Sequence, residues 1–275
     1  MSTLGIVAGG GDLPIAIASE CARPVFLVAL TGSADAAIEK FPHERAGIGE
    51  TGKIFRLLRD HGCTDVILAG KVTRPAWGDV KVDARGALAA PKIIAAALRG
   101  DDALLRMIAA MFEREGFHIV SAAEAAPALL AGETTITKAK PSDRDEADIA
   151  IAVRIVRELG ALDIGQAAVV CEGLALAVEA AEGTDAMIQR IASLPDNIRG
   201  TVAKRRGVLV KAPKPIQDRK TDLPVIGVQT IAHAAASGLS GIALEAGGAL
   251  IVNRKAVVEA ADTAGLFVTG FARAQ

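Results

Sequence analysis

Aromatic residues are scarce in this chain of 275 residues: Phe, Trp and Tyr together make up 3% of it, and Tyr is absent. Proteins that bind single-stranded nucleic acid stack the bases on aromatic side chains, so this scarcity argues against that class. Apolar residues still reach 51%. The core must therefore be built from Ala, Val, Ile and Leu, which is typical of tightly packed α/β layers.

Cysteine is also rare, with three residues far apart at Cys21, Cys63 and Cys171. No CxxC pair occurs, so the spacing indicates neither a zinc site nor a disulfide framework. The chain start lacks the basic and apolar regions of a signal peptide, and no run of about 20 strongly apolar residues suits a membrane span. We expect a cytoplasmic protein with reduced, mostly buried cysteines.

Neither sign of charge dominates, because 31 Lys and Arg nearly balance 32 Asp and Glu. The whole molecule therefore has no attraction to nucleic acid or acidic membranes, and any basic site must be local. Residues 201–220 form such a local stretch, with seven cations suited to phosphate: Lys204, Arg205, Arg206, Lys211, Lys214, Arg219 and Lys220. We expect no nucleic-acid partner, because no aromatic residues interleave with these cations.

Short apolar runs alternate with helical patterns in the first half of the chain, which predicts a parallel sheet. Strands are expected at residues 4–8, 24–30 and 65–69, and helices at residues 15–21 and 51–60. The rhythm breaks at residues 131–141, where we place a domain boundary. The predicted fold class is α/β, with a Rossmann-like nucleotide-binding domain at 1–131, a catalytic domain with a mixed sheet at 132–275, and a substrate cleft between them.

A glycine-rich turn follows the first predicted strand and precedes a helix. It contains Gly10, Gly11, Asp12 and Leu13. Backbone N–H groups at such a place bind phosphate or another anion. The dinucleotide fingerprint fails, because Pro14 stands at its third glycine position and no acidic residue ends the second strand. The turn therefore indicates a phosphate-type site without a nicotinamide cofactor, or a tight structural turn.

A second polar loop follows the third predicted strand, with Lys71, Thr73 and Arg74. Ligands of open α/β sheets bind outside the carboxyl ends of the strands, so this loop is expected beside the glycine turn. The alternative is a solvated loop. Further along, Asp101 and Asp102 precede a helix, where Asp most often serves as the N-cap.

An acidic turn in the second half joins a predicted strand to a helix. It holds Glu179, Glu182, Gly183, Thr184 and Asp185. Carboxylates with a nearby hydroxyl suit a hard divalent cation. The alternative is a helix start capped by Thr184 or Asp185 and flanked by solvated acids.

The loop at residues 211–227 carries both kinds of ligand. Its prolines exclude a regular helix or a central strand, which leaves a stiff, polar loop. Asp218 and Asp222 are metal-type ligands, and its cations suit phosphate. Together with the loops of the first half, it predicts metal-assisted chemistry on a phosphate ester or anhydride. The histidines are scattered and are interpreted as structural: His43, His61, His118 and His233.

Five motifs occur together and in order, at residues 7–14, 68–75, 100–106, 177–185 and 214–227. Together they resemble the LpxI-type family of UDP-2,3-diacylglucosamine pyrophosphatases of Gram-negative bacteria. The resemblance implies a dimeric, Mg²⁺-dependent (or Mn²⁺-dependent) hydrolase of lipid A synthesis, in peripheral contact with the inner membrane at most. Its lipid-linked UDP-sugar substrate would be split into UMP and 2,3-diacylglucosamine 1-phosphate (lipid X).

The resemblance also implies roles for individual residues. The nucleotide end of the substrate would be held by Gly10, Gly11, Asp12, Leu13, Lys71 and Thr73. Metal ligands would be Asp222, Glu182 and Asp185, with Asp222 as the critical aspartate. Lys211, Gln217 and Asp218 would complete the catalytic group. Further substrate contacts would come from Asp101, Asp102, Gly183, Thr184 and Lys214.

Two other functions remain open from the residues alone. One is a hydrolase of a soluble sugar nucleotide. The other is a regulator that binds a nucleotide or phospholipid without catalysis.

Overall fold

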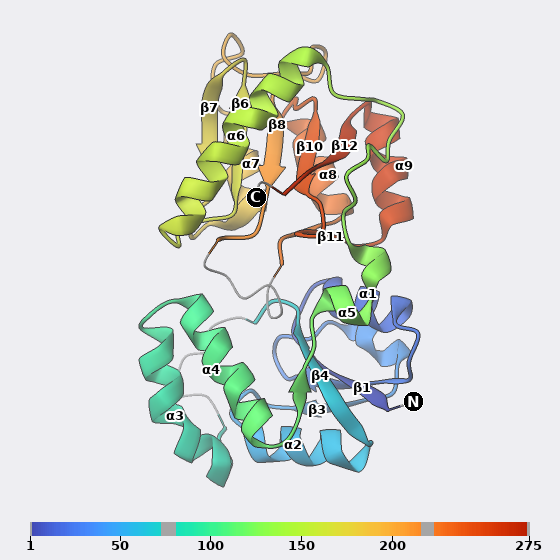
Figure 1. Ribbon diagram of the computed structural model, residues 1–275, viewed down its shortest axis with the longest axis vertical. Helices are drawn as coiled ribbons and strands as arrows, with labels where there is room; N and C mark the ends of the chain where they lie inside the picture. Colours follow the sequence, from blue (N-terminus) through green and yellow to red (C-terminus); the bar gives the residue numbers. More distant parts are fainter. Residues whose placement is uncertain (1, 73–80, 216–222, 274–275) are drawn as a thin grey trace. The chain divides into compact units, whose positions relative to one another are not determined.

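The computed structural model describes residues 2–72, 81–215 and 223–273. The chain folds as two compact units that divide between Ala128 and Leu129. Each unit has its own sheet and helices (Figure 1). In the described ranges, every helix is too short or too polar to cross a bilayer.

The N-terminal unit is built on a five-stranded sheet in the order β3-β2-β1-β4-β5, with every neighbouring pair parallel. Its strands are β1 (Thr3–Ala8), β2 (Val25–Leu30), β3 (His43–Ala46), β4 (Cys63–Ala69) and β5 (His118–Ile119). The predicted Rossmann-like parallel sheet is confirmed. Strand β3 escaped prediction because it lies at the sheet edge, where Glu44 and Arg45 face solvent and the apolar pattern is lost.

Some helices of this unit pack on the sheet, and others pack on neighbouring helices. They are α1 (Leu13–Glu20), α2 (Thr51–Asp60), α3 (Ala84–Ala97), α4 (Asp101–Arg114) and α5 (Ala122–Ala125), with short 3-10 turns at Ala36–Lys40 and Pro127–Leu129. A cluster of three rings ties α2 and α4 to the strand region: Phe55 and Phe112 meet edge to face at 5.0 Å, and Phe117 lies near both. Three of the chain's eight aromatic residues thus pack together in one core.

One carboxylate joins two helix starts in this unit. Asp83 accepts hydrogen bonds from the backbone N–H of Gly86 in α3 (2.7 Å) and of Lys53 in α2 (3.0 Å). Burial opposes its ionisation, but backbone N–H donors outweigh burial and hold the pKa of Asp83 below its ordinary value. Asp83 therefore caps α2 and α3 together.

The C-terminal unit contains a mixed five-stranded sheet in the order β12-β10-β8-β6-β7. Its strands are β6 (Ala167–Cys171), β7 (Leu174–Val178), β8 (Val208–Lys211), β10 (Gly241–Glu245) and β12 (Phe267–Phe271), and β6 runs antiparallel to both neighbours. A separate two-stranded sheet pairs β9 (Val225–Ile226) with β11 (Leu250–Ile251). The predicted mixed sheet is confirmed.

Helices cover both faces of the mixed sheet (Figure 1). They are α6 (Asp143–Ala161), α7 (Gly183–Ile191), α8 (Val228–Ala236) and α9 (Arg254–Ala264). Val208 and Val210 of β8 pack toward α6, whereas Leu209 packs toward α7, α8 and α9. Since both faces of the strand are buried, its sequence reads as a continuous apolar run.

Local sequence features explain how α6 begins and ends. Ser142 and Asp145 form a capping box at its start. Gly160 lies one residue before its end, and its missing side chain leaves room for Pro215; a Cβ there would lie 2.8 Å from the proline Cδ. The hairpin turn at Glu172 and Gly173 has φ of 50° and 82°, as a tight two-residue turn requires.

The cysteines are free thiols. Cys63 and Cys171 are buried, as expected, and burial raises the pKa of each to about 11. Both are therefore protonated at neutral pH, which suits core residues and excludes a thiolate nucleophile at either position.

Candidate functional site

The glycine turn and the Lys71 loop are hydrogen-bonded to each other at the end of strands β1 and β4. Gly9 N–H donates to Ala69 O, and Gly10 and Lys71 exchange N–H···O bonds, each at 2.8 Å. Strand β1 lies between β2 and β4, so this is the point where the strand order reverses and α/β proteins form their ligand crevice. The predicted closeness of the two loops is confirmed.

Glycine is required at this junction for close backbone approach. A Cβ on Gly9 would lie 2.4 Å from Lys71 O. Gly70 has φ of +92°, and a Cβ there would lie 2.7 Å from Gly10 O. A side chain at either position would force the two loops apart.

The N–H groups of the glycine turn are used inside the protein. Those of Gly9 and Gly10 bind the β4 loop, and Gly11 N–H donates to Asp35 Oδ2 at 2.6 Å. In this conformation Gly10 and Gly11 therefore shape the turn without offering these donors to a phosphate. Beside them lie Asp12 and Leu13 at the start of α1 and the exposed Lys71, the cation of this group.

Asp35 is a residue that sequence reasoning missed. It lies five positions beyond the end of β2, at the start of the turn Ala36–Lys40, and the chain doubles back to place its carboxylate on Gly11. An acidic side chain near the end of the second strand accepts ribose hydroxyls in dinucleotide sites. Asp35 can do the same chemistry, although it comes too late in the sequence to match that spacing.

In the C-terminal unit, three charged residues lie at one edge of the mixed sheet. Lys211 ends β8, Glu245 ends β10 and Glu179 directly follows β7. These strands run in one direction, so their carboxyl ends share an edge; the Glu179 N–H bonds Ala167 O, and Ala167 pairs with Lys211. All three side chains are at most 7% exposed. The acidic turn and the start of the 211–227 loop thus lie on either side of the start of β6.

Glu245 was not anticipated as a site residue. It ends an apolar strand, and it is 4% exposed beneath the Gly247–Gly248 turn, where a Cβ on Gly248 would lie 2.7 Å from its Oε1. Buried carboxylates are rare unless paired. In the sequence, the signal that could have identified Glu245 is an acidic residue at the end of the apolar run 241–244.

The acidic turn is held by its own side chains. Glu179 accepts from Thr184 Oγ1 (3.0 Å) and from Gln166 N–H (3.3 Å). Glu182 pairs with Arg190 at 3.1 Å. The alternative in which Thr184 or Asp185 caps the helix is wrong: α7 starts at Gly183, with Glu182 at the N-cap position and no side-chain cap. Thr184 instead orients Glu179.

Asp185 faces His233, a histidine that sequence reasoning treated as structural. His233 Nδ1 lies 3.5 Å from Asp185 Oδ1, and its Nε2 lies 2.9 Å from the amide nitrogens of Gln189 and Gln229. Among the described residues, His233 Nδ1 is buried without a hydrogen-bond partner, so it lies near the Asp185 carboxylate but is not bonded to it. This network brings α8 to the acidic turn.

The cations at the start of the 211–227 loop have protein partners. Lys211 Nζ donates to Val225 O at 3.0 Å, which joins the two ends of the loop, and Lys214 pairs with Asp163 at 2.7 Å. Seven predicted residues lie outside the described part of the chain: Thr73, Arg74, Gln217, Asp218, Arg219, Lys220 and Asp222. Their roles stay predictions.

The basic stretch does not form one patch. Lys204, Arg205 and Arg206 precede β8 and so lie at the opposite sheet edge from Lys211, because the strand separates them. Arg206 pairs with Glu172 at 2.6 Å, and Arg205 donates to Ala235 O, with burial lowering its pKa. Arg205 and Arg206 thus make contacts within the C-terminal unit.

Two further expectations concern a helix start and a metal. The N-cap of α4 is Gly100, and Asp101 and Asp102 are the first helical residues, so the Asp N-cap alternative is wrong.

Among the described residues, no three His, Cys, Asp or Glu side chains are grouped to hold a metal. Glu182 and Asp185 face Arg190 and His233, so the described residues do not by themselves form the predicted metal site.

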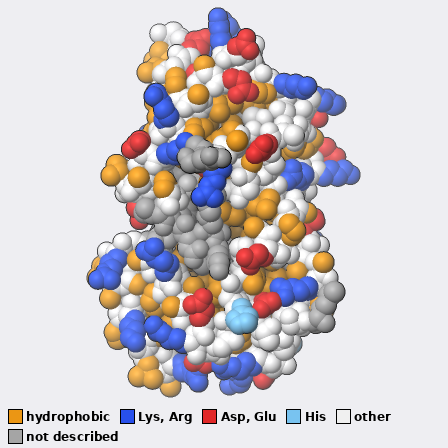
Figure 2. All heavy atoms as spheres, in the orientation of Figure 1, with side chains coloured by type: hydrophobic (Ala, Val, Ile, Leu, Met, Phe, Trp, Pro, Cys, Tyr) orange, Lys and Arg blue, Asp and Glu red, His pale blue; other side chains and the backbone are white. Residues whose placement is uncertain are grey.

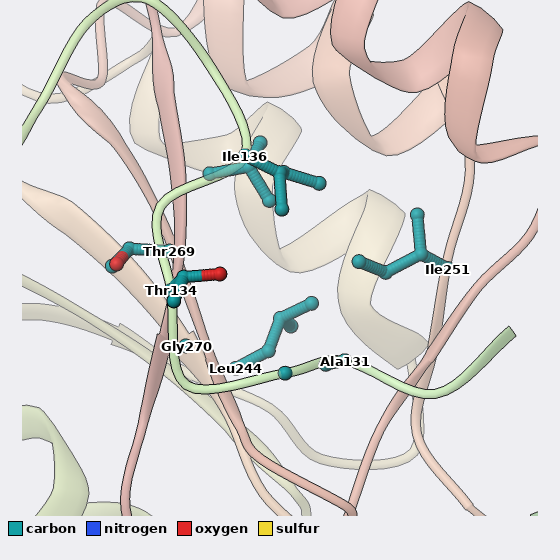
Figure 3. A pocket seen from close by; sticks show the side chains of 9 residues that line it. Ala131, Thr134, Ile136, Leu244, Ile251, Thr269 and Gly270 are labelled. Atoms are coloured by element: carbon teal, nitrogen blue, oxygen red, sulfur yellow. The ribbon is translucent and has the colours of Figure 1, made fainter. Parts of the chain in front are cut away.

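A small pocket lies under the segment at residues 131–136 (Figure 3). Leu244, Ile251 and Ile136 line it, and Thr269 at its rim shares a hydrogen bond with Thr135 at 2.8 Å. Its empty volume of about 160 Å³, including the part open to solvent, is below the roughly 300–1,000 Å³ of ligand pockets. It is a packing gap of the C-terminal core.

Comparison with known proteins identifies the family. The LpxI N-terminal domain model matches residues 3–129, and the LpxI C-terminal domain model matches residues 132–269. A relative from Caulobacter vibrioides, UDP-2,3-diacylglucosamine pyrophosphatase LpxI, is 50% identical over 273 residues, which cover 98% of this chain and 98% of the relative. The resemblance carried by the five ordered motifs is confirmed, and this chain belongs to the LpxI family.

Proposed function

We propose that this protein hydrolyses the diphosphate of UDP-2,3-diacylglucosamine to UMP and 2,3-diacylglucosamine 1-phosphate, a step of lipid A synthesis. The observation that carries the proposal is the 50% identity, over nearly the full length of both chains, to a relative with that name. The positions of the two predicted loop systems, each at the carboxyl edge of its own sheet, support it.

The N-terminal unit would hold the nucleotide end. Lys71 is exposed beside the glycine turn and offers a cation to phosphate. The Asp35 carboxylate accepts from a ribose hydroxyl while its other interaction, with Gly11 N–H, keeps it in place. The cation of Lys71 and the carboxylate of Asp35 would thus suit a ligand that carries phosphates at one end and hydroxyls at the other.

The loop at residues 211–227 would supply the catalytic group. In hydrolysis, a water oxygen forms a bond to one phosphorus, the bridging P–O bond breaks, and the water's proton is taken up by a base. We assign the base to Asp222, which the family resemblance marks as critical. Lys211 holds the end of its loop through Val225 O, and the acidic turn follows β7, which β6 separates from β8.

Mg²⁺ dependence forms part of the proposal. A diphosphate carries several negative charges, and a bound Mg²⁺ supplies the positive charge that eases cleavage. Glu182 and Asp185 offer two carboxylates of the required type, and Asp222 would be a third. We also propose a cytoplasmic, homodimeric enzyme in peripheral contact with the membrane.

The test is direct assay of the purified protein with detergent-dispersed UDP-2,3-diacylglucosamine, with products identified by mass spectrometry. We expect UMP and the acyl sugar 1-phosphate, and a loss of at least about 100-fold in the Asp222→Asn variant. UDP-N-acetylglucosamine is the soluble control. Turnover of the soluble sugar nucleotide alone would favour a different hydrolase. Binding of the lipid without turnover would favour a regulator.

A further inference from the structure

Helix α3 leaves an apolar face uncovered in the described structure. Leu88 is 81% exposed and Leu98, which follows the helix, is 85% exposed. These leucines share a face with Ala84, Pro91 and Ala95, because the positions recur at spacings of three and four. Such a concentration of exposed large apolar side chains on one helix marks an interaction surface.

The rest of α3 explains why this face is free. The helix packs mainly on α4 and α2, and its buried positions, Gly86 and Ala96, lie on another side. Burial of one side therefore leaves the apolar face directed outward. Figure 2 shows hydrophobic and cationic side chains next to each other over this helix, at the lower left.

A row of cations borders the apolar face. Arg85, Lys92 and Arg99 recur every seven residues, close to two helical turns, and Lys81 precedes them. Arg85 also pairs with Glu115 at 2.5 Å. Asp83 is the single acid between residues 81 and 100, and its carboxylate caps α2 and α3. A chain with net charge −1 thus carries a local strip of positive charge along α3.

We propose that this face of α3 docks onto an anionic lipid bilayer. Apolar side chains that enter the headgroup region beside a row of Lys and Arg are the pattern of interfacial helices. A second copy fits less well, because the α3 of a partner would bring no free carboxylate for these cations. The inference rests on the proposed function, since a substrate with two acyl chains resides in a bilayer and α3 would bring the enzyme to it.

Cosedimentation with lipid vesicles tests the surface. We expect the wild-type chain to sediment with vesicles that contain phosphatidylglycerol and to remain in solution with phosphatidylcholine alone. The Leu88→Gln/Leu98→Gln variant should bind at least about tenfold more weakly. Lys92→Gln/Arg99→Gln should bind these vesicles about 25-fold more weakly at low salt, which corresponds to about fivefold per charge. Leu162→Gln is the matched control, because Leu162 is 71% exposed in the C-terminal unit.

Several outcomes would overturn the proposal. One is a wild-type chain that ignores phosphatidylglycerol vesicles, and another is a leucine variant that binds them as well as the wild type. A third is a variant that only converts a dimer to a monomer in sedimentation velocity, which would assign the face to a second copy. Activity on detergent-dispersed substrate should be unchanged in the leucine variant. If the wild type fails that assay, the proposed function is lost while the vesicle result still decides the surface.

Discussion

Lys211 Nζ donates a hydrogen bond to Val225 O at 3.0 Å, so a buried cation at the end of β8 holds the far end of the loop that follows it. The Lys211 residue is 4% exposed. Val225 begins β9, which pairs with β11. The predicted catalytic loop is therefore anchored at both ends within one unit.

Replacement of Lys211 should damage catalysis through the loop. Lys211→Met keeps much of the volume but removes the donor to Val225, so we expect kcat to fall at least about tenfold with a smaller change in KM. Lys211→Arg should not restore activity, because a guanidinium does not fit a site built around a compact ammonium. Circular dichroism checks folding. A kcat near that of the wild type in Lys211→Met would contradict the anchoring role.

His233 should matter for activity because it faces Asp185. We expect His233→Gln to lower kcat by about tenfold, since the imidazole that lies 3.5 Å from the Asp185 carboxylate is lost. His118→Gln is the control, because its side chain is 82% exposed in the other unit. Steady-state kinetics and thermal melts separate the outcomes: a lower melting temperature with unchanged kcat would leave His233 as a core residue only.

Asp35 can be tested with an isosteric change. Asp35→Asn keeps an oxygen for Gly11 N–H but removes the charge, so a ribose hydroxyl would lose a strong acceptor. We expect KM for the UDP substrate and the dissociation constant of UMP to rise by about tenfold, with kcat little changed. Glu39→Gln, on the following turn, serves as control. Tighter UMP binding in Asp35→Asn would show that the carboxylate only repels phosphate.

Asp83 should contribute to stability in a pH-dependent way. Asp83→Ala removes a cap from two helices, and each cap contributes about 1 kcal/mol, so the free energy of unfolding should fall by about 2 kcal/mol. Because the pKa of Asp83 is lowered in the folded state, its contribution is present above the ordinary Asp pKa near 3.9 and disappears as pH falls through the folded value.

Urea titrations at several pH values measure this contribution. The difference between wild type and Asp83→Ala should be large at neutral pH and should shrink in acid. Asp196→Ala is the comparison, since Asp196 is a surface acid paired with Arg199. A constant difference at all pH values would mean that contacts other than the ionised carboxylate hold the two helices.

Metal removal tests the Mg²⁺ proposal. Dialysis against excess chelator should lower turnover by at least about 100-fold, because the charge of the diphosphate is no longer balanced. Added Mg²⁺ or Mn²⁺ should restore it. Equilibrium dialysis with Mn²⁺ gives a second readout, in which Asp222→Asn should bind less metal than wild type. Full turnover in chelator would remove the metal from the proposal.

Short-range features of this protein follow from its sequence. The capping box of Ser142 and Asp145, the turn at Glu172 and Gly173 and the apolar strands depend on neighbours within a few positions, so a local pattern specifies them. The position of Lys71 beside the glycine turn also follows, because the ends of parallel strands meet at one edge. The family resemblance required the whole set of motifs in order.

Tertiary structure alone decided which side chains meet. The cations before and after β8 are close together in the sequence, but they lie at opposite ends of this strand. Arg206 pairs with Glu172 at one end, and Lys211 lies at the other. Asp35 reaches Gly11, and His233 reaches Asp185, across 24 and 48 positions of the chain. Local periodicity holds no information on such pairs, since they arise only when separate elements pack on a common sheet.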